Sequence, residues 1–375
     1  MKIVVALDSF KGSLTAAEAC DVVTVALREA MPQAEIVTKP MADGGEGTAA
    51  ALMAAAGGTW IERRVTGPLP QMEVDAGFVW LPDDRTAVVE MAAASGLQLL
   101  MPEQQNPLDT TTYGTGQLIA AAAEHGAERL LLAVGGSATV DGGVGAATAL
   151  GWRFLARDGR EIHLGGGRLR EIVEIIPPDR ALAAPIDVLC DVDNPLCGPH
   201  GAACVYGPQK GATPDGVARL DAGLGHLAEL VHSQLGLKIA DVPGAGAAGG
   251  LAAGALAFMG ARLVSGVEVV MAQIGLPEAV VDADWVITGE GCFDHQSLRG
   301  KVVSGVTRIA WTGGARVAVL AGQVRLPAEV YRTYGIEAAL GCIDDSSRLS
   351  YALAHSKELL GQATRRLAEE HLARQ

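Results

Sequence analysis

The chain has 375 residues, of which 49% are hydrophobic and 19% are charged, and its formal net charge is −14. This length exceeds what one hydrophobic core usually serves, so two domains are expected. The acidic charge and the lack of a Lys/Arg-rich run argue against a nucleic-acid partner and against binding to a membrane, because both need a basic face.

Short apolar runs recur along the chain and are separated by helical segments. Each run lacks polar alternation and ends at a glycine or an aspartate or just before one. Such runs predict strands buried on both faces of a parallel sheet, and their alternation with helices predicts α/β architecture. The runs are Ile3–Leu7, Leu130–Val134, Trp285–Thr288 and Val317–Ala321.

Helix signals lie between these runs. Thr15 and Glu18 form a capping-box pattern that predicts a helix running to about Met31, just before Pro32. Thr213 followed by Pro214 predicts an N-cap and first turn of a helix that continues towards Leu235. The spacing of Ala, Gly and apolar residues predicts two further helices, over 48–56 and 115–125.

The composition changes after Gly67–Pro70. The segment that follows, Met72–Glu90, has strand-like residues around a turn at 82–84. We interpret this change as the point where the chain leaves the first domain.

Polar loops follow several of the predicted strands. In doubly wound sheets, ligands bind beyond the carboxyl ends of the strands, where such loops lie. Asp8–Ser13 places a carboxylate, two hydroxyls and Lys11 between a strand and a capped helix. Ala42–Thr48 is glycine-rich and runs into a helix N-terminus, a position that favours anions. Asp43 and Glu46 in that loop then need a counter-cation such as Mg²⁺ or a lysine. Ordinary turns with polar caps are the alternative for both loops.

The loop Gly135–Gly143 is the strongest physical signal in the sequence. It follows a strand, precedes a helix, and combines two glycine pairs with Ser137, Thr139 and Asp141. Glycine backbone N–H groups and hydroxyls suit a phosphate, and the carboxylate suits Mg²⁺. The sequence therefore predicts a phosphate cradle here.

Two later loops carry similar chemistry. Asp191 and Asn194 follow a strand and suit a polyol hydroxyl or a metal, with an Asx-turn before Pro195 as the alternative. Gly289–Asp294 contains Glu290 and is followed by Lys301.

Two common nucleotide-binding motifs bear on the class of enzyme. The pattern GxxxxGK[ST] is absent, which excludes a P-loop nucleotide hydrolase. One GxGxxG occurs at Gly244–Gly249, but Pro243 precedes it where the dinucleotide fingerprint needs a strand. Glu268 lies at a suitable distance beyond it, so a dehydrogenase stays open on spacing alone.

Taken together, the loops resemble the type-1 glycerate kinase family, which contains the bacterial glycerate 2-kinases. Each string is weak alone, but they keep the family's order over nearly the whole chain. Two positions depart from the family pattern: Val140 stands where Asn is frequent, and Cys292 where Arg is frequent, so Arg299 or Lys301 would supply that charge. The strings are DSFKGSLTA at 8–16, ADGGEGT at 42–48, GGSATVDGG at 135–143, DVDNPLCG at 191–198, GPQKGA at 207–212, GAGAAGGL at 244–251 and ITGEG at 287–291.

The resemblance implies two α/β domains. A Rossmann/flavodoxin-like parallel-sheet domain would comprise residues 1–66 plus 283–375, and a mixed-sheet α/β domain would be inserted at 67–282. The substrates would bind in a cleft between the domains.

The resemblance also implies ATP-dependent phosphorylation of D-glycerate to 2-phosphoglycerate, in organic-acid catabolism, with ATP and Mg²⁺ required. We expect Asp191 to orient the glycerate hydroxyl or accept its proton, with Asp43 as the rival. Lys11 would lie near the glycerate carboxylate or the transferring phosphoryl group. Mg²⁺ would bind Asp141 first and Glu290 second.

The remaining expected contacts fall into two sets. The substrate-binding set is Asp8, Ser9 and Asn194. The set expected to bind the ATP phosphates is Gly135, Gly136, Ser137, Thr139, Gly142, Gly143 and Lys301.

Alternatives remain open at this point. A glycerate 3-kinase would give 3-phosphoglycerate, and a non-catalytic sensor of an organic acid or nucleotide would use similar loops. The six cysteines fit no metal-ligand spacing and suit free thiols in a reducing cytoplasm. We expect small-molecule substrates, no nucleic acid and no membrane partner, with monomer and homodimer both open.

Overall fold

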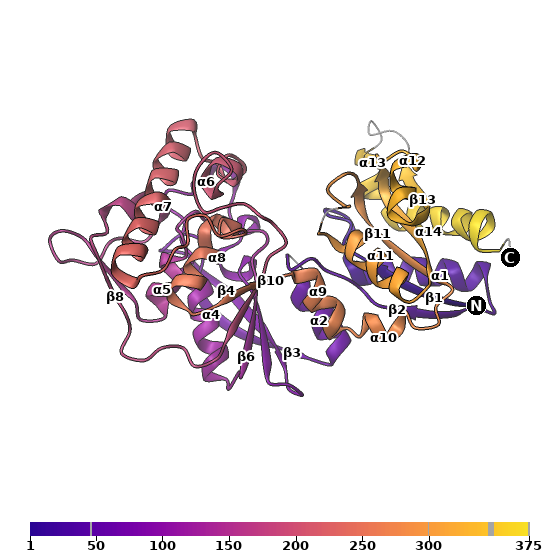
Figure 1. Ribbon diagram of the computed structural model, residues 1–375, viewed down its shortest axis with the longest axis horizontal. Coiled ribbons are helices and arrows are strands. Elements are labelled where there is room, and N and C mark those ends of the chain that lie inside the picture. Colours follow the sequence, from indigo (N-terminus) through magenta and orange to yellow (C-terminus); the bar gives the residue numbers. More distant parts are fainter. Residues whose placement is uncertain (46, 299, 344–348, 374–375) are drawn as a thin grey trace. The chain divides into compact units, whose positions relative to one another are not determined.

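The computed structural model describes residues 1–45, 47–298, 300–343 and 349–373 (Figure 1). It divides into two compact units. The terminal unit comprises Met1–Asp43, Ala50–Ala56 and Val267–Gln375, and the inserted unit comprises Gly44–Ala49 and Gly57–Gly266. The chain therefore crosses between units within 44–57 and again at 267, rather than at 67 and 283 as expected.

The terminal unit is built on a five-stranded sheet in the order β13-β12-β11-β1-β2, and every neighbouring pair is parallel. Counted along the chain, this order is 2-1-3-4-5, the flavodoxin-like arrangement of a doubly wound sheet. The predicted Rossmann/flavodoxin-like class is confirmed. The strands are β1 (Lys2–Leu7), β2 (Glu35–Thr38), β11 (Trp285–Phe293), β12 (Arg316–Val324) and β13 (Ile336–Ile343).

Helices cover this sheet because its strands are apolar on both faces. Ile3, Val5 and Leu7 are fully buried in one cluster with residues of α1 and α14. The predicted capping box is present, since the Thr15 hydroxyl accepts from the Glu18 amide at 3.2 Å and the Glu18 carboxylate accepts from the Thr15 amide at 3.1 Å. The helices are α1 (Ala16–Ala30), α2 (Thr48–Ala56), α9 (Gly266–Gln273), α10 (Leu276–Ala279), α11 (Val302–Thr312), α12 (Ala328–Tyr331), α13 (Leu349–Ala354) and α14 (Ser356–Leu367), with a π-helical turn at Ala368–Leu372 and a 3-10 turn at Arg332–Tyr334.

The inserted unit contains a mixed six-stranded sheet in the order β10-β9-β6-β5-β4-β3. Its β3, β4 and β5 are antiparallel, whereas β5, β6, β9 and β10 run parallel. Pairing of β3 with β4 draws residues 59–66 into this unit, which is why the crossing lies earlier than the composition change suggested. The strands are β3 (Thr59–Thr66), β4 (Glu73–Leu81), β5 (Thr86–Glu90), β6 (Arg129–Ala133), β9 (Ile186–Leu189) and β10 (Arg262–Val264), with a separate hairpin of β7 (Arg153–Leu155) and β8 (Glu174–Ile176).

The helices of the inserted unit enclose a large apolar core between themselves and this sheet. Thr213 caps α7 as predicted, accepting a hydrogen bond from the Gly216 amide at 3.1 Å. In the part of the chain that the structure describes, no helix is long and apolar enough to cross a membrane. The helices are α3 (Ala92–Ser95), α4 (Tyr113–Glu124), α5 (Val144–Ala149), α6 (Ala202–Tyr206), α7 (Pro214–Leu235) and α8 (Ala247–Phe258), with 3-10 turns at Leu97–Leu99, Pro102–Gln104, Gly166–Glu171 and Pro208–Lys210.

The GxGxxG segment leads into the start of α8 and packs against the glycine loop. Ala248, Gly249 and Gly250 adopt left-handed backbone conformations there. Gly249 accepts a hydrogen bond from the Gly142 amide at 3.1 Å, and a Cβ on Gly249 would lie 1.9 Å from the Thr139 carbonyl oxygen. A turn, not a strand, precedes the segment, so the context of a dinucleotide fingerprint is missing.

Gly249→Ala should destabilise the protein, because the substitution adds both a left-handed alanine and an overlap with the Thr139 carbonyl. We expect the free energy of unfolding to fall by at least about 2 kcal/mol in urea titrations. Gly225→Ala is the control, since Gly225 lies within α7 with nothing within 4 Å of its added Cβ. The free energy of unfolding of that variant should rise by up to about 1 kcal/mol. Equal stabilities of the two variants would contradict the packing described here.

Candidate active site

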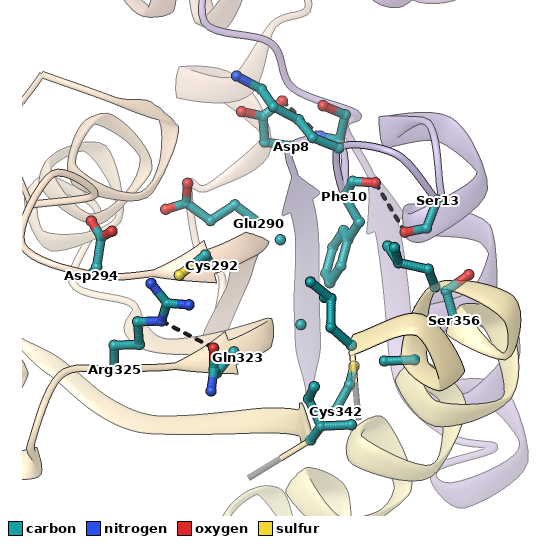
Figure 2. Close-up of a pocket in the computed structure, with 18 of the residues that line it drawn as sticks. Asp8, Phe10, Ser13, Glu290, Cys292, Asp294, Gln323, Arg325, Cys342 and Ser356 are labelled. Carbon is teal, nitrogen blue, oxygen red and sulfur yellow. Dashed lines mark hydrogen bonds between the residues drawn. The ribbon is translucent and has the colours of Figure 1, made fainter. Parts of the chain in front are cut away.

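A pocket of about 440 Å³ lies in the terminal unit, at the carboxyl ends of the sheet strands (Figure 2). Its size is typical of small-molecule sites. In the flavodoxin-like order the strand sequence reverses between β1 and β11, and ligands bind beyond the strands at such a reversal. The loop after β1 and the end of β11 both line the pocket. The fold thus places this pocket where a doubly wound sheet binds its ligand.

Asp8 follows β1 directly and is the most perturbed carboxyl of the pocket. Burial, followed by repulsion from Asp43, raises the pKa of Asp8 to about 7. Lys11 and a 2.6 Å hydrogen bond from the Ser9 amide oppose that rise. Loss of a proton from Asp8 is therefore costly in this structure unless a cation approaches.

Glu290 projects from β11 towards the same region (Figure 2). Burial is the main cause that raises the pKa of Glu290, and a hydrogen bond from Ser297 and the charge of Lys301 oppose it. Its Oε1 is buried and has no hydrogen-bond partner among the described residues. A buried carboxylate oxygen without a donor is expensive, so this atom suits a ligand or an ion.

These carboxylates fit a magnesium ion that arrives with a nucleotide. Among the described residues, no group of three or more His, Cys, Asp or Glu side chains is arranged to hold a metal alone. Mg²⁺ in phosphate-transfer sites is usually held by one or two carboxylates together with phosphate oxygens. Glu290 and a second carboxylate of the pocket, Asp8 or Asp43, would meet that requirement.

Arg325 is a pocket residue that the sequence analysis missed. Its Nε donates to the Gln323 side-chain oxygen at 3.0 Å (Figure 2), and its charge acts on the nearby Cys292 thiol. The apolar run at the start of β12 predicted a strand ending at Ala321, but β12 continues to Val324. Polar residues after that run were the available signal. Arg325 supplies a guanidinium beside Cys292, where the resemblance leads one to expect an arginine.

Six of the sequence-predicted residues come together at this pocket, and the others lie in the inserted unit. The residues brought together are Asp8, Ser9, Lys11, Asp43, Glu290 and Lys301. The structure also adds Phe10, Gln323 and Ser356 to the lining. Glu46 and Arg299, which the sequence analysis considered, lie outside the described residues.

Asp141 lies inside the inserted unit and stabilises its own loop. It is 1% exposed. Its carboxylate accepts hydrogen bonds from the Thr112 amide at 2.8 Å, the Thr112 hydroxyl at 2.9 Å, the Gly143 amide at 3.1 Å and the Gly145 amide at 3.3 Å. A metal would have to displace these donors. Its predicted role as a Mg²⁺ ligand stays a prediction that this geometry does not favour.

Lys210 holds the centre of the same loop. Its Nζ donates to the Ser137 hydroxyl at 2.6 Å and to the Thr139 carbonyl at 2.8 Å. Burial lowers the pKa of Lys210 to about 7, opposed by the charge of Asp141. Ser137 and Thr139 are buried, and so are Gly142 and Gly143, whereas Gly136 is exposed and Gly135 partly exposed. Most of the predicted phosphate cradle is thus engaged in internal packing.

Asp191 and Asn194 follow β9 in the inserted unit, as the strand pattern predicted. The Asn194 side-chain oxygen accepts from the Tyr206 hydroxyl at 2.6 Å, and its amide donates to the His200 carbonyl at 2.8 Å. These bonds fix the orientation of Asn194. The substrate roles of both residues stay predictions.

Comparison with known proteins decides the family. A profile of the glycerate kinase family matches residues 3–372. A protein of Halalkalibacterium halodurans named glycerate kinase is 45% identical over 370 residues, covering 98% of this chain and 97% of that protein. The chain belongs to the glycerate kinase family.

Other members of the glycerate kinase family agree over the full length. An Escherichia coli K12 protein named glycerate 2-kinase is 42% identical over 372 residues, which cover 98% of this chain and 97% of that protein. A crystal structure from Salmonella typhimurium LT2, described provisionally as glycerate kinase 2, is 41% identical with a TM-score of 0.86 and covers 100% of this chain and 98% of its own. The fold described above is therefore the fold of the glycerate kinase family.

Asp8→Asn should make stability less dependent on pH. Because the folded-state pKa of Asp8 is about 7 and its usual value is 3.8, the folded wild type keeps a proton that the unfolded chain releases between these values. Its stability should therefore fall as pH rises from 4 to 7. At pH 8 in EDTA, we expect the variant to melt about 2–4 °C above the wild type, and the difference to shrink towards pH 4.

Asp83→Asn, which removes an exposed carboxylate from the turn between β4 and β5, controls for the loss of one charge. In this control, we expect the difference in melting temperature from the wild type to stay constant from pH 4 to 8. The same constant difference for Asp8→Asn would overturn the account of Asp8. Circular dichroism melts at each pH provide the measurement.

Proposed function

We propose that this chain transfers the γ-phosphate of ATP to the 2-hydroxyl of D-glycerate and releases ADP and 2-phosphoglycerate. The observation that carries the proposal is the cluster of Asp8, Lys11, Glu290 and Lys301 at the strand-order reversal of a glycerate kinase family fold. The choice of the 2-hydroxyl is supported by the relative named glycerate 2-kinase. We assign the reaction to organic-acid catabolism.

Charge neutralisation is the main demand of phosphoryl transfer. Among the described residues that line the pocket, the cations are Lys11, Lys301 and Arg325, within a chain whose net charge is −14. A local group of cations is what allows an acidic protein to bind two anionic substrates. We therefore assign these three side chains to phosphate oxygens and to the glycerate carboxylate.

The carboxylates have a separate role. Glu290, with Asp8 or Asp43, would hold Mg²⁺ against the phosphates, and the ion would neutralise charge on them. In the transfer, the glycerate hydroxyl oxygen bonds to the γ-phosphorus while the bond to the β–γ bridging oxygen breaks. The hydroxyl proton passes to a carboxylate, for which Asp191 is our assignment and Asp43 the rival. Ser9 and Asn194 are assigned to orienting glycerate.

The reaction is assigned to the cytoplasm, where ATP is made. All six cysteines are free, which supports a reducing compartment. Monomer and homodimer are equally consistent with the proposal.

The product identifies the reaction. Purified protein, D-glycerate, ATP and Mg²⁺ are mixed with enolase, and phosphoenolpyruvate is followed by its absorbance. We expect signal without added phosphoglycerate mutase, because enolase uses the 2-phosphate and not the 3-phosphate. Signal that appears only with mutase would instead identify a glycerate 3-kinase. No ADP formation under either condition would favour a sensor of an organic acid or nucleotide.

Lys11→Ala should lower kcat/KM for D-glycerate at least about tenfold, because a cation that contacts charge in the transition state is lost. Lys11 is exposed, so the melting temperature should stay close to that of the wild type. Lys238→Ala removes an exposed lysine of the inserted unit and should leave kcat/KM within about twofold. Steady-state kinetics with the enolase assay make the comparison. Near-wild-type kinetics for Lys11→Ala would remove Lys11 from the site.

A further inference from the structure

The pocket of the terminal unit has two chemically different halves. Figure 2 shows Glu290, Asp294 and Arg325 on one side and Phe10 and Cys342 on the other. The apolar half is lined by one aromatic ring from the loop after β1, by the end of β13 and by α13. Its apolar residues are Phe10, Cys342, Ile343, Leu349, Ala352 and Leu353, and Ser356 adds one hydroxyl.

D-glycerate has no part that suits the apolar half. Each of its three carbons carries a carboxylate or hydroxyl oxygen, and burying such groups against apolar walls without partners is unfavourable. Among the described residues of the lining, the charged half supplies the charged groups that a carboxylate and phosphates require. The apolar half therefore indicates a larger ligand with an apolar, flat portion.

The pocket is also long enough for such a ligand. Its lining reaches from the loop after β1 to β13, and β11 and β12 lie between these strands. Three strand spacings of about 4.8 Å give roughly 14 Å along the sheet edge. A ligand that fills this length must join an apolar group to a strongly anionic one.

We infer that the nucleotide binds within this pocket, with its base and ribose in the apolar half between Phe10 and α13 and its phosphates directed to Lys11, Lys301 and Arg325. The inference rests on the proposed function, which makes ATP the phosphate donor. The Ser356 hydroxyl, at the start of α14, lies at this half and offers a hydrogen bond to the base or ribose.

This assignment differs from the sequence-based expectation for the ATP phosphates. The loop Gly135–Gly143 was expected to hold them, but its Ser137 and Thr139 are buried. The Ser137 hydroxyl and the Thr139 carbonyl both accept a hydrogen bond from Lys210. Side-chain cations of the terminal unit take that role instead. Lys301 is the one residue common to both assignments.

Ala352→Trp tests the inference. Ala352 lines the apolar half and is half-buried, so an indole at this position fills space that the base needs. Ala354→Trp is the matched control, because Ala354 lies on the same helix, is exposed and is not part of the pocket lining. Isothermal titration calorimetry of the full chain with ADP and Mg²⁺ should show affinity at least about tenfold weaker for Ala352→Trp and within about twofold of wild type for Ala354→Trp. In the enolase assay, the KM for ATP should rise at least about tenfold in Ala352→Trp, while the KM for D-glycerate changes less than about threefold.

Unchanged ADP affinity in a folded Ala352→Trp would overturn the inference. If that variant does not fold, Leu353→Glu provides the same test, because Leu353 is 41% exposed and a carboxylate there would disfavour an apolar base. Leu237→Glu is its control, at 42% exposure in the inserted unit.

Failure of the inference and failure of the proposed function give different results. A wild type that phosphorylates D-glycerate, combined with a folded Ala352→Trp that binds ADP normally, would keep the function and overturn the nucleotide position. A wild type that binds ADP but does not phosphorylate D-glycerate, with ADP binding lost in Ala352→Trp, would keep the nucleotide position and overturn the function. A wild type that binds no ADP would overturn the nucleotide position directly.

Discussion

The parallel pairing of β1 with β11 is the interaction on which the terminal unit depends. It joins the first strand of the chain to a strand near residue 290, with Ile3 opposite Trp285 and Leu7 opposite Gly289. The Asp8 amide extends the pairing by donating to the Gly289 carbonyl at 2.9 Å. On the other side of β11, a Cβ on Gly289 would lie 1.8 Å from the Leu320 carbonyl oxygen, so only glycine allows β12 to lie this close. The same pairing creates the strand-order reversal and places the groups that follow β1 beside those at the end of β11.

That arrangement concentrates negative charge in a partly buried pocket. Burial, together with repulsion from neighbouring carboxylates such as Asp43, raises the pKa of both Asp8 and Glu290, and Lys11 and Lys301 offset this only in part. Carboxylates held in this way gain stability when a cation arrives, and phosphates gain stability from the neighbouring lysines and Arg325. The pocket is therefore suited to a ligand that carries an anion and a metal ion together, which is what a phosphate donor with Mg²⁺ provides.

The inserted unit uses similar residue types for packing. Asp141 accepts hydrogen bonds from backbone and hydroxyl donors, and Lys210 donates to Ser137 and to the Thr139 carbonyl. Gly249 is required where α8 meets the Thr139 carbonyl. A glycine loop with hydroxyls and a carboxylate thus has two physical uses, to bind a phosphate or to satisfy its own buried backbone. The two uses look alike in a sequence.

The sequence by itself determined the α/β class, the buried strands such as β1 and β6, the capped starts of α1 and α7, and the family. These features depend on patterns within a few neighbouring residues or on the order of motifs along the chain. It also placed Lys11, Glu290 and other polar groups at strand ends, because strand ends are local features. Only the tertiary structure decided that β3 joins the inserted sheet, that Arg325 reaches the pocket, and that Phe10 and α13 form its apolar half. Each of these results from contacts between segments far apart in the chain, and such contacts have no local signature in the sequence.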